Sequence, residues 1–120
     1  MFLAVAFKLS NPPYKNESAP VYEANLGPGV LGQSNNNGTI IINEKLDPKF
    51  HKEVIRHEAV HIDQMSRGDL DYDNNNIYWK GKKYSKNDPK IAMASPSNSP
   101  WEAEAYKKSG TKYKNSKYNV

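Results

Sequence analysis

Residues 48–67 read PKFHKEVIRHEAVHIDQMSR, and this stretch decides the fold because it predicts one long amphipathic helix. Asp47 precedes it as a good N-cap, Pro48 suits the first helical position, and Gly68 stands where a left-handed residue often ends a helix. At 3.6 residues per turn, the charged and apolar side chains separate onto opposite faces. We therefore expect a helix from about Pro48 to Arg67 with one face against the core.

The two faces of this helix differ in chemistry. The predicted polar face comprises Lys49, Lys52, Glu53, Arg56, Asp63, Gln64 and Arg67. The predicted inward face comprises Phe50, Val54, His57, His61 and Met65, flanked by Ile55, Ala59 and Ile62. Glu58 falls at the margin of the inward face. Because an unpaired buried ionisable group is costly, these inward histidines and Glu58 need partners, and a metal ion is a natural one.

The centre of the helix, residues 57–61, carries an H-E-x-x-H pattern. Two histidines four residues apart point the same way and can share one metal ion, and Glu58 lies close enough to take a proton from a metal-bound water. Zinc with two imidazoles, an open position and an adjacent carboxylate is suited to hydrolysing amide bonds. The alternative is structural: the histidines hydrogen-bond to the backbone in the core, and Glu58 pairs with a basic residue.

A catalytic zinc ion normally takes three protein ligands, so a third is needed. His51 points away from the direction of the pentad. The extended motif with a further histidine is absent, because position 67 is arginine. Downstream, Ser99 and Pro100 predict the start of a second helix, and Ser-x-x-Glu is a capping-box pattern. The search for the third ligand therefore turns to the carboxylates of this second helix.

Two glutamates lie on the second helix. Trp101, Ala105 and Tyr106 define its apolar side. Glu102 falls between Ala105 and Tyr106, whereas Glu104 falls on the far side. An acid within the apolar arc needs a buried partner, so Glu102 is the predicted third ligand. Glu104 is the alternative ligand, and in another alternative Glu102 only completes the capping box and favours the helix dipole.

These motifs resemble a known family. Residues 55–61, IRHEAVH, followed downstream by residues 102–105, EAEA, resemble small zincin metallopeptidases of the gluzincin type. In that family the third ligand is a glutamate on a later helix, often in an E-x-x-A setting. The chain is also similar to minimal zincin-like domains of bacteriophage and bacterial genomes, which often carry a Trp-x-Gly hairpin like residues 78–82, YWKGK.

The resemblance implies an α+β fold, a minimal zincin-like domain in which a small β-sheet packs on the buried H-E-x-x-H helix, with a second ligand-bearing helix. It implies that His57, His61 and Glu102 bind Zn²⁺. Glu58 is then the general base of a zinc metallopeptidase that acts on a peptide, a protein or a peptidoglycan peptide. Tyr106 stands where the family often has an acidic residue, and no motif assigns an oxyanion-stabilising residue.

Two other functions remain open. The first is a catalytically inactive zincin-like structural or binding module of a phage virion or secretion particle, which the small core favours. The second is an anion- or nucleic-acid-binding protein that uses a basic tail. Residues 107–120 hold five lysines and no acid. We predict that they form a flexible, solvated tail after a single domain spanning residues 1–106, with no nucleic-acid partner.

Composition limits the class of protein. The chain has 120 residues and 37% hydrophobic content, which predicts one loop-rich domain with a modest core. It has no cysteine, which excludes disulfides and thiolate ligands, so metal chemistry must rest on histidine and carboxylates. Residues 2–7, FLAVAF, are too short to cross a membrane and lack a basic n-region, so we expect an N-terminal strand or packed segment. We predict no membrane partner and a cytoplasmic or virion-associated location.

The remaining segments give weaker signals. Residues 39–43, TIIIN, are the best strand, and by the resemblance they form a cleft edge to which an extended peptide adds; the alternative is an ordinary core strand. Turns are expected to dominate residues 21–38, a hairpin residues 77–84 and a loop residues 85–99. Residues 69–74, DLDYDN, begin like a calcium loop but lack its glycine and its bidentate glutamate, so we expect a solvated connection.

Overall fold

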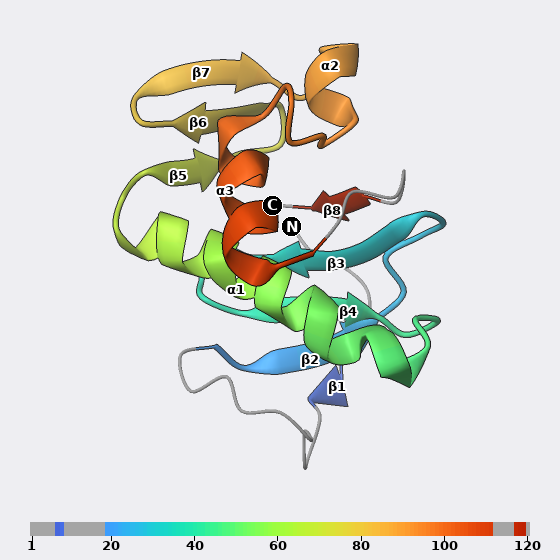
Figure 1. Ribbon diagram of the computed structural model, residues 1–120. Coiled ribbons are helices and arrows are strands. Elements are labelled where there is room, and N and C mark those ends of the chain that lie inside the picture. Colours follow the sequence, from blue (N-terminus) through green and yellow to red (C-terminus); the bar gives the residue numbers. More distant parts are fainter. Residues whose placement is uncertain (1–6, 9–18, 112–116, 120) are drawn as a thin grey trace.

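A computed structural model describes residues 7–8, 19–111 and 117–119, which form two β-sheets and three α-helices (Figure 1). This confirms the predicted α+β class. In chain order the elements are β1 (Phe7–Lys8), β2 (Val21–Ala24), β3 (Val30–Ser34), β4 (Ile40–Asn43), the 3-10 turn η1 (Pro48–Phe50), α1 (His51–Ser66), β5 (Leu70–Tyr72), β6 (Asn76–Trp79), β7 (Lys82–Ser85), α2 (Pro89–Ala92), α3 (Pro100–Ser109) and β8 (Lys117–Asn119).

The H-E-x-x-H stretch forms the predicted helix. The side chain of Asp47 caps the first turn by accepting a hydrogen bond from the Lys49 backbone N–H. This first turn is η1, and α1 continues from it. Gly68 follows the helix with a φ of 85°, a left-handed conformation that glycine adopts at no steric cost. The local capping signals therefore predicted both ends of the helix.

The first sheet has the strand order β1-β2-β4-β3-β8. Its middle strand, β4, pairs in parallel with β2 and antiparallel with β3, so every residue of β4 is buried. The prediction of a strand at residues 39–43 is confirmed, but its predicted role as a cleft edge is wrong. Both edges of β4 are already hydrogen-bonded, so no peptide can add to it, and the alternative of a core strand holds.

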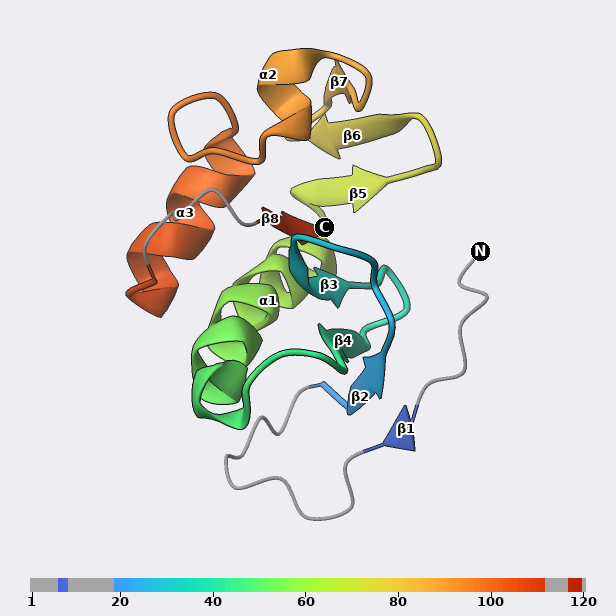
Figure 2. The same ribbon diagram turned by 90° about the vertical axis from the view of Figure 1, so that its right-hand side faces the viewer.

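Helix α1 lies between the first sheet and α3 (Figure 2). The core cluster on this side of the molecule comprises Ala19, Val21, Ile40, Ile42, Val54, Ile55, Ile62 and Tyr106. Gly32 of β3 allows the close approach of the sheet to α1, because a Cβ atom at this position would lie 2.6 Å from Val54 Cγ1. The same Cβ would lie 3.1 Å from Cγ of Glu58, so Gly32 also makes room for the H-E-x-x-H glutamate.

The second sheet, β5-β6-β7, is antiparallel throughout. The predicted hairpin is confirmed: β6 and β7 are joined by Lys80 and Gly81, with φ of 49° and 83°. Two successive positive φ angles are typical of a type I′ turn. A second core cluster holds this sheet against α2 and α3 and comprises Leu70, Ile77, Trp79, Ile91 and Trp101.

Several segments predicted as turns or loops are regular. Residues 21–38 contain β2 and β3, and residues 85–99 contain α2, whose Asp88 side chain caps the Lys90 N–H. The predicted connection at residues 69–74 contains strand β5. Its last acid, Asp73, accepts hydrogen bonds from two backbone N–H groups of the β5–β6 turn. These predictions are wrong because short strands and a four-residue helix are stabilised by tertiary partners rather than by local propensity.

The chain remains part of the fold beyond Tyr106. Helix α3 continues to Ser109, and Thr111 is buried. Strand β8 then pairs in parallel with β3 at the edge of the first sheet. These positions correct the predicted boundary between a domain and a flexible tail, while residues 112–116 lie outside the described residues. Of the predicted N-terminal segment, only Phe7 is described, in β1. None of the helices that the structure describes has the length and apolar character needed to cross a bilayer.

The Gly32→Ala variant tests the close approach of β3 to α1. We expect it to lower the free energy of unfolding by about 1–3 kcal/mol, because the added methyl group overlaps Val54. Urea unfolding monitored by circular dichroism measures the change. Gln33→Ala, at the next position of the same strand, is the control. An equal loss in both variants would mean that strand pairing rather than the contact with α1 sets the cost.

Candidate metal centre

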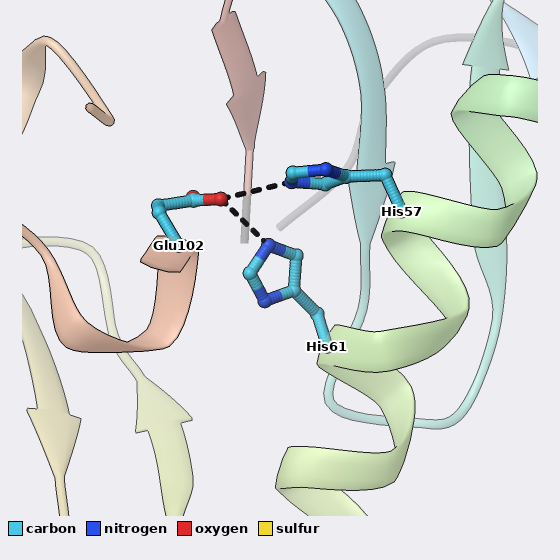
Figure 3. Close-up of side chains that lie close together, drawn as sticks. All are labelled: His57, His61 and Glu102. Atoms are coloured by element: carbon cyan, nitrogen blue, oxygen red, sulfur yellow. Dashed lines mark hydrogen bonds and ion pairs between the residues drawn. The ribbon is translucent and has the colours of Figure 1, made fainter. Parts of the chain in front are cut away.

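Three side chains from two helices meet at one point between α1 and α3 (Figure 3). His57 Nε2 and His61 Nε2 lie 2.9 Å and 3.0 Å from the same oxygen, Oε1 of Glu102. All three side chains are buried, with at most 1% of each exposed. The potential ligand atoms lie within 4.8 Å of one another. The structure thus brings together the three residues that the sequence predicted.

Local structure explains this convergence. One turn of α1 separates His57 from His61, so both rings project from the same face toward α3. Pro100 occupies the first turn of α3, and Ser99 is its N-cap residue, as predicted. However, the Ser99 side chain makes no capping hydrogen bond, so the capping box does not form. Glu102 instead turns toward the histidines, which removes the alternative in which it serves only as a cap.

The other candidate ligands lie outside this cluster. Glu104 accepts hydrogen bonds from Arg67 Nη2 and Gln64 Nε2, so its carboxylate joins the end of α1 to α3 rather than the histidine pair. His51 Nε2 lies 3.2 Å from the Leu46 carbonyl oxygen, which agrees with its exclusion from the site. Neither residue belongs to the group that could hold a metal ion.

Each histidine has a second side-chain partner on its far ring nitrogen. His57 Nδ1 lies 3.0 Å from Thr111 Oγ1, and His61 Nδ1 lies 2.8 Å from Gln64 Oε1. Both of these partners are side chains, whereas the structural alternative expected backbone partners. Gln64 was predicted on the polar face, and this is wrong: it is fully buried, because α3 packs against that side of α1. The i, i+3 spacing from His61 was the signal that could have identified it.

Glu58 lies beside the cluster and faces β3. Its Oε1 accepts a hydrogen bond of 2.5 Å from Ser34 Oγ. Among the residues that the structure describes, no group donates a hydrogen bond to its Oε2, although that atom is buried. The alternative in which Glu58 pairs with a basic residue is therefore wrong within the described part of the chain. A buried carboxyl oxygen without a hydrogen-bond partner normally costs stability in either protonation state.

Burial and charge set the protonation of the site. Burial raises the pKa of Glu58 to about 8, because the ionised carboxylate loses its hydration. For His61, burial opposes the positive charge, but the carboxylate of Glu102 outweighs it and raises the pKa to about 9. For His57, burial dominates and lowers the pKa. For Glu102, burial is outweighed by the His61 charge and by hydrogen bonds from both rings, so its pKa is lowered.

The residues present fit a divalent metal ion. Two imidazole nitrogens and one carboxylate oxygen form a donor set that zinc and related transition metals prefer. Their far ring nitrogens have hydrogen-bond partners, as metal-binding histidines normally do. These three residues could hold a cation, but their geometry does not identify which metal it is. Comparison of the chain with protein-family models, curated proteins and solved structures finds no match in any of the three.

The protonation of the metal-free site predicts a dependence of stability on pH. The pKa of His61 is raised from 6.5 and that of Glu58 from 4.5, so at neutral pH both groups hold protons more tightly in the folded than in the unfolded chain. Their contributions have the same sign and are lost as pH rises toward 9. The lowered pKa values of His57 and Glu102 change the stability only below pH 6.5, outside the range from pH 7 to pH 9. We therefore expect the melting temperature in chelator to fall between pH 7 and pH 9.

Thermal unfolding monitored by circular dichroism in the presence of a chelator measures this trend. The Glu58→Gln variant is the matched control, because an amide cannot ionise and its melting temperature should fall less steeply. A melting temperature that rises from pH 7 to pH 9 in the wild-type chain would contradict the assigned protonation.

Proposed function

We propose that this chain is a zinc-dependent metallopeptidase with a zincin-like fold. In this proposal His57, His61 and Glu102 hold the zinc ion, Glu58 is the general base, and the substrate is a peptide or a protein, including a peptide of peptidoglycan. The single observation that carries the proposal is the meeting of two histidines and Glu102 beside a second buried carboxylate. The H-E-x-x-H pattern and the E-x-x-A setting of Glu102 support it.

The residues around the ion have separate roles: three bind it and Glu58 transfers protons. A divalent ion held by His57, His61 and Glu102 would supply Lewis acidity, which would lower the pKa of a bound water and polarise a carbonyl group. Glu58 accepts a proton from the attacking water at Oε2, because Oε1 already accepts a hydrogen bond from Ser34 Oγ. It then passes the proton to the leaving amine. Burial raises the pKa of Glu58 to about 8, and a cation beside it would oppose this shift and favour the ionised form that accepts a proton.

The site is closed to solvent, so the proposed hydrolysis requires a route by which a substrate can enter. Glu58 and both histidines have no exposed surface, so no substrate can reach them in this arrangement. Strand β8 lies between β3 and β5 in both views (Figures 1 and 2). It pairs with the edge of β3, the strand whose Gly32 and Ser34 contact Glu58. We infer that β8 leaves this edge before hydrolysis, because the edge of β3 would then become available to an extended peptide.

The same closure favours a second candidate function. A metal site whose ligand side chains are all buried also suits a structural ion, because such an ion does not have to meet a substrate. In this alternative the chain is an inactive zincin-like structural or binding module, such as a component of a phage virion or secretion particle. It differs from the first proposal in that the bound metal ion never meets a substrate.

Metal analysis of purified variants tests the proposed centre. We expect one zinc ion per wild-type chain and its loss in His57→Ala and Glu102→Ala, because two ligands do not hold a catalytic zinc ion. Glu44→Ala, at an exposed glutamate outside the cluster, is the matched control and should retain zinc. Glu58→Gln should also retain zinc but lose hydrolysis of peptides or peptidoglycan fragments, by at least a factor of about 100. Hydrolysis that survives in Glu58→Gln would exclude Glu58 as the general base.

Truncation after Thr111 tests the closure by β8. The truncated chain keeps the partner of His57 but lacks the strand on β3. We expect faster release of zinc to a chelator and faster peptide hydrolysis than in the full chain. A synthetic peptide with the sequence of residues 112–120 should slow both rates when added back, whereas a scrambled peptide should not. Faster zinc release without any hydrolysis would favour the structural module, and unchanged rates would show that β8 does not close the site.

A further inference from the structure

We propose that Gln64 and Thr111 are positioning residues that hold the two histidine rings with Nε2 toward Glu102. They do so in different ways: the oxygen of Gln64 can only accept a hydrogen bond from its histidine, whereas the hydroxyl of Thr111 can either accept or donate one. This inference rests on the proposed metal centre. Neither residue belongs to the H-E-x-x-H or E-x-x-A motif, and both were assigned by sequence to solvent, on a polar helix face and in a tail.

The orientation of the Gln64 amide is determined by its partners. Its Nε2 lies 3.0 Å from the Trp101 carbonyl oxygen and 3.0 Å from Glu104 Oε1. Both partners accept hydrogen bonds, so they require the NH₂ group at this end of the amide. The oxygen of Gln64 must then face His61. An amide oxygen only accepts, so the His61 Nδ1 that lies 2.8 Å away must carry a proton.

The consequence for His61 is a fixed tautomer. When the ring is neutral, its one proton is on Nδ1, so Nε2 offers its lone pair toward Glu102. Glu104 is held in turn by the guanidinium of Arg67. The carbonyl that receives the other Gln64 hydrogen belongs to Trp101, the residue before Glu102. Gln64 therefore sets the tautomer of one ligand and anchors the backbone next to another.

Thr111 reaches the same result for His57 with a hydroxyl group. Its Oγ1 lies 3.0 Å from His57 Nδ1 and 2.6 Å from Ser109 Oγ. Ser109 Oγ donates its only hydrogen to the Ala105 carbonyl oxygen, 2.5 Å away. Ser109 must therefore accept from Thr111 whenever these two hydroxyls are hydrogen-bonded. Thr111 Oγ1 is then an acceptor for a proton on His57 Nδ1, which leaves the lone pair of Nε2 for a cation.

The hydroxyl of Thr111 can also rotate, which the amide of Gln64 cannot. If Thr111 donates to His57 Nδ1, the ring proton moves to Nε2, where it hydrogen-bonds to Glu102 Oε1, 2.9 Å away. His57 can thus hold a proton toward Glu102 in the metal-free chain and release Nε2 to a metal ion, with a partner for Nδ1 in both states. The two histidines therefore differ: the orientation of His61 is permanent, whereas His57 adjusts to the ion.

Zinc affinity and imidazole NMR together test these roles. Thr111→Val removes the hydroxyl while keeping the shape, Gln64→Met removes both polar groups, and Thr111→Ser restores the hydroxyl. Competition with a chelator should show zinc affinity weakened by about 10–100-fold in Thr111→Val and Gln64→Met, and near the wild-type value in Thr111→Ser. In ¹⁵N-resolved spectra of the zinc-loaded chain, the Nδ1 protons of both rings should be protected from exchange with water.

The NMR readout separates positioning from a general loss of stability. Thr111→Val should expose only the Nδ1 proton of His57, and Gln64→Met only that of His61. Asn43→Ala is the stability control, because the Asn43 side chain donates hydrogen bonds to the carbonyl oxygens of Gly27 and Val30 rather than to the histidines. It should lower the melting temperature and leave zinc affinity unchanged.

The outcomes distinguish this inference from the proposed function. If the wild-type chain takes up no zinc, the metal centre fails and this inference fails with it. If the wild-type chain binds zinc, and Thr111→Val and Gln64→Met bind it equally well, the inference is overturned while the metal centre stands. The same conclusion follows if both variants weaken zinc binding but each leaves the Nδ1 proton of its own histidine protected.

Discussion

The contact of one carboxylate oxygen of Glu102 with two imidazoles is the constraint on which this structure depends. It joins α1 to α3 in a region with almost no exposure to water. Three ionisable groups buried together are unfavourable unless each has a partner of complementary charge or a cation lies among them. In the absence of a cation, the proton on His61 fills this role, which is why its pKa is raised even though burial opposes the charge.

The parts of the fold that the sequence predicted well are those set by local physics. Asp47 and Gly68 limit the helix by capping, and the lysine–glycine pair at positions 80–81 determines the turn of the hairpin. The choice of Glu102 over Glu104 followed from helical periodicity, which places only Glu102 within the apolar arc. Helical spacing predicts which face of a helix is buried when most of its apolar residues are buried and most of its polar residues are exposed.

The parts that the sequence missed depend on partners far along the chain. Strands β2 and β3 lie in a segment rich in glycine and asparagine, and they are strands because β4 pairs with both of them. Gln64 has the polarity of a surface residue, but α3 supplies acceptors for its amide hydrogens. Thr111 lies in a basic segment with no motif, and only the folded chain brings it to His57. In each case a tertiary contact overrides a correct local preference.

Oε2 of Glu58 has no hydrogen-bond partner among the described residues, and this bears on the choice between a catalytic and a structural role. A closed structural site needs its ligands and their outer partners, but it gains nothing from another buried carboxylate with an oxygen that has no donor among the described residues. Such a group costs about 1–3 kcal/mol, and an apolar side chain of similar size would avoid that cost. Gly32, which leaves room for Glu58, adds the conformational cost of a glycine within a strand. Two destabilising choices at one point are the arrangement expected if, as proposed, Oε2 exchanges a proton during hydrolysis.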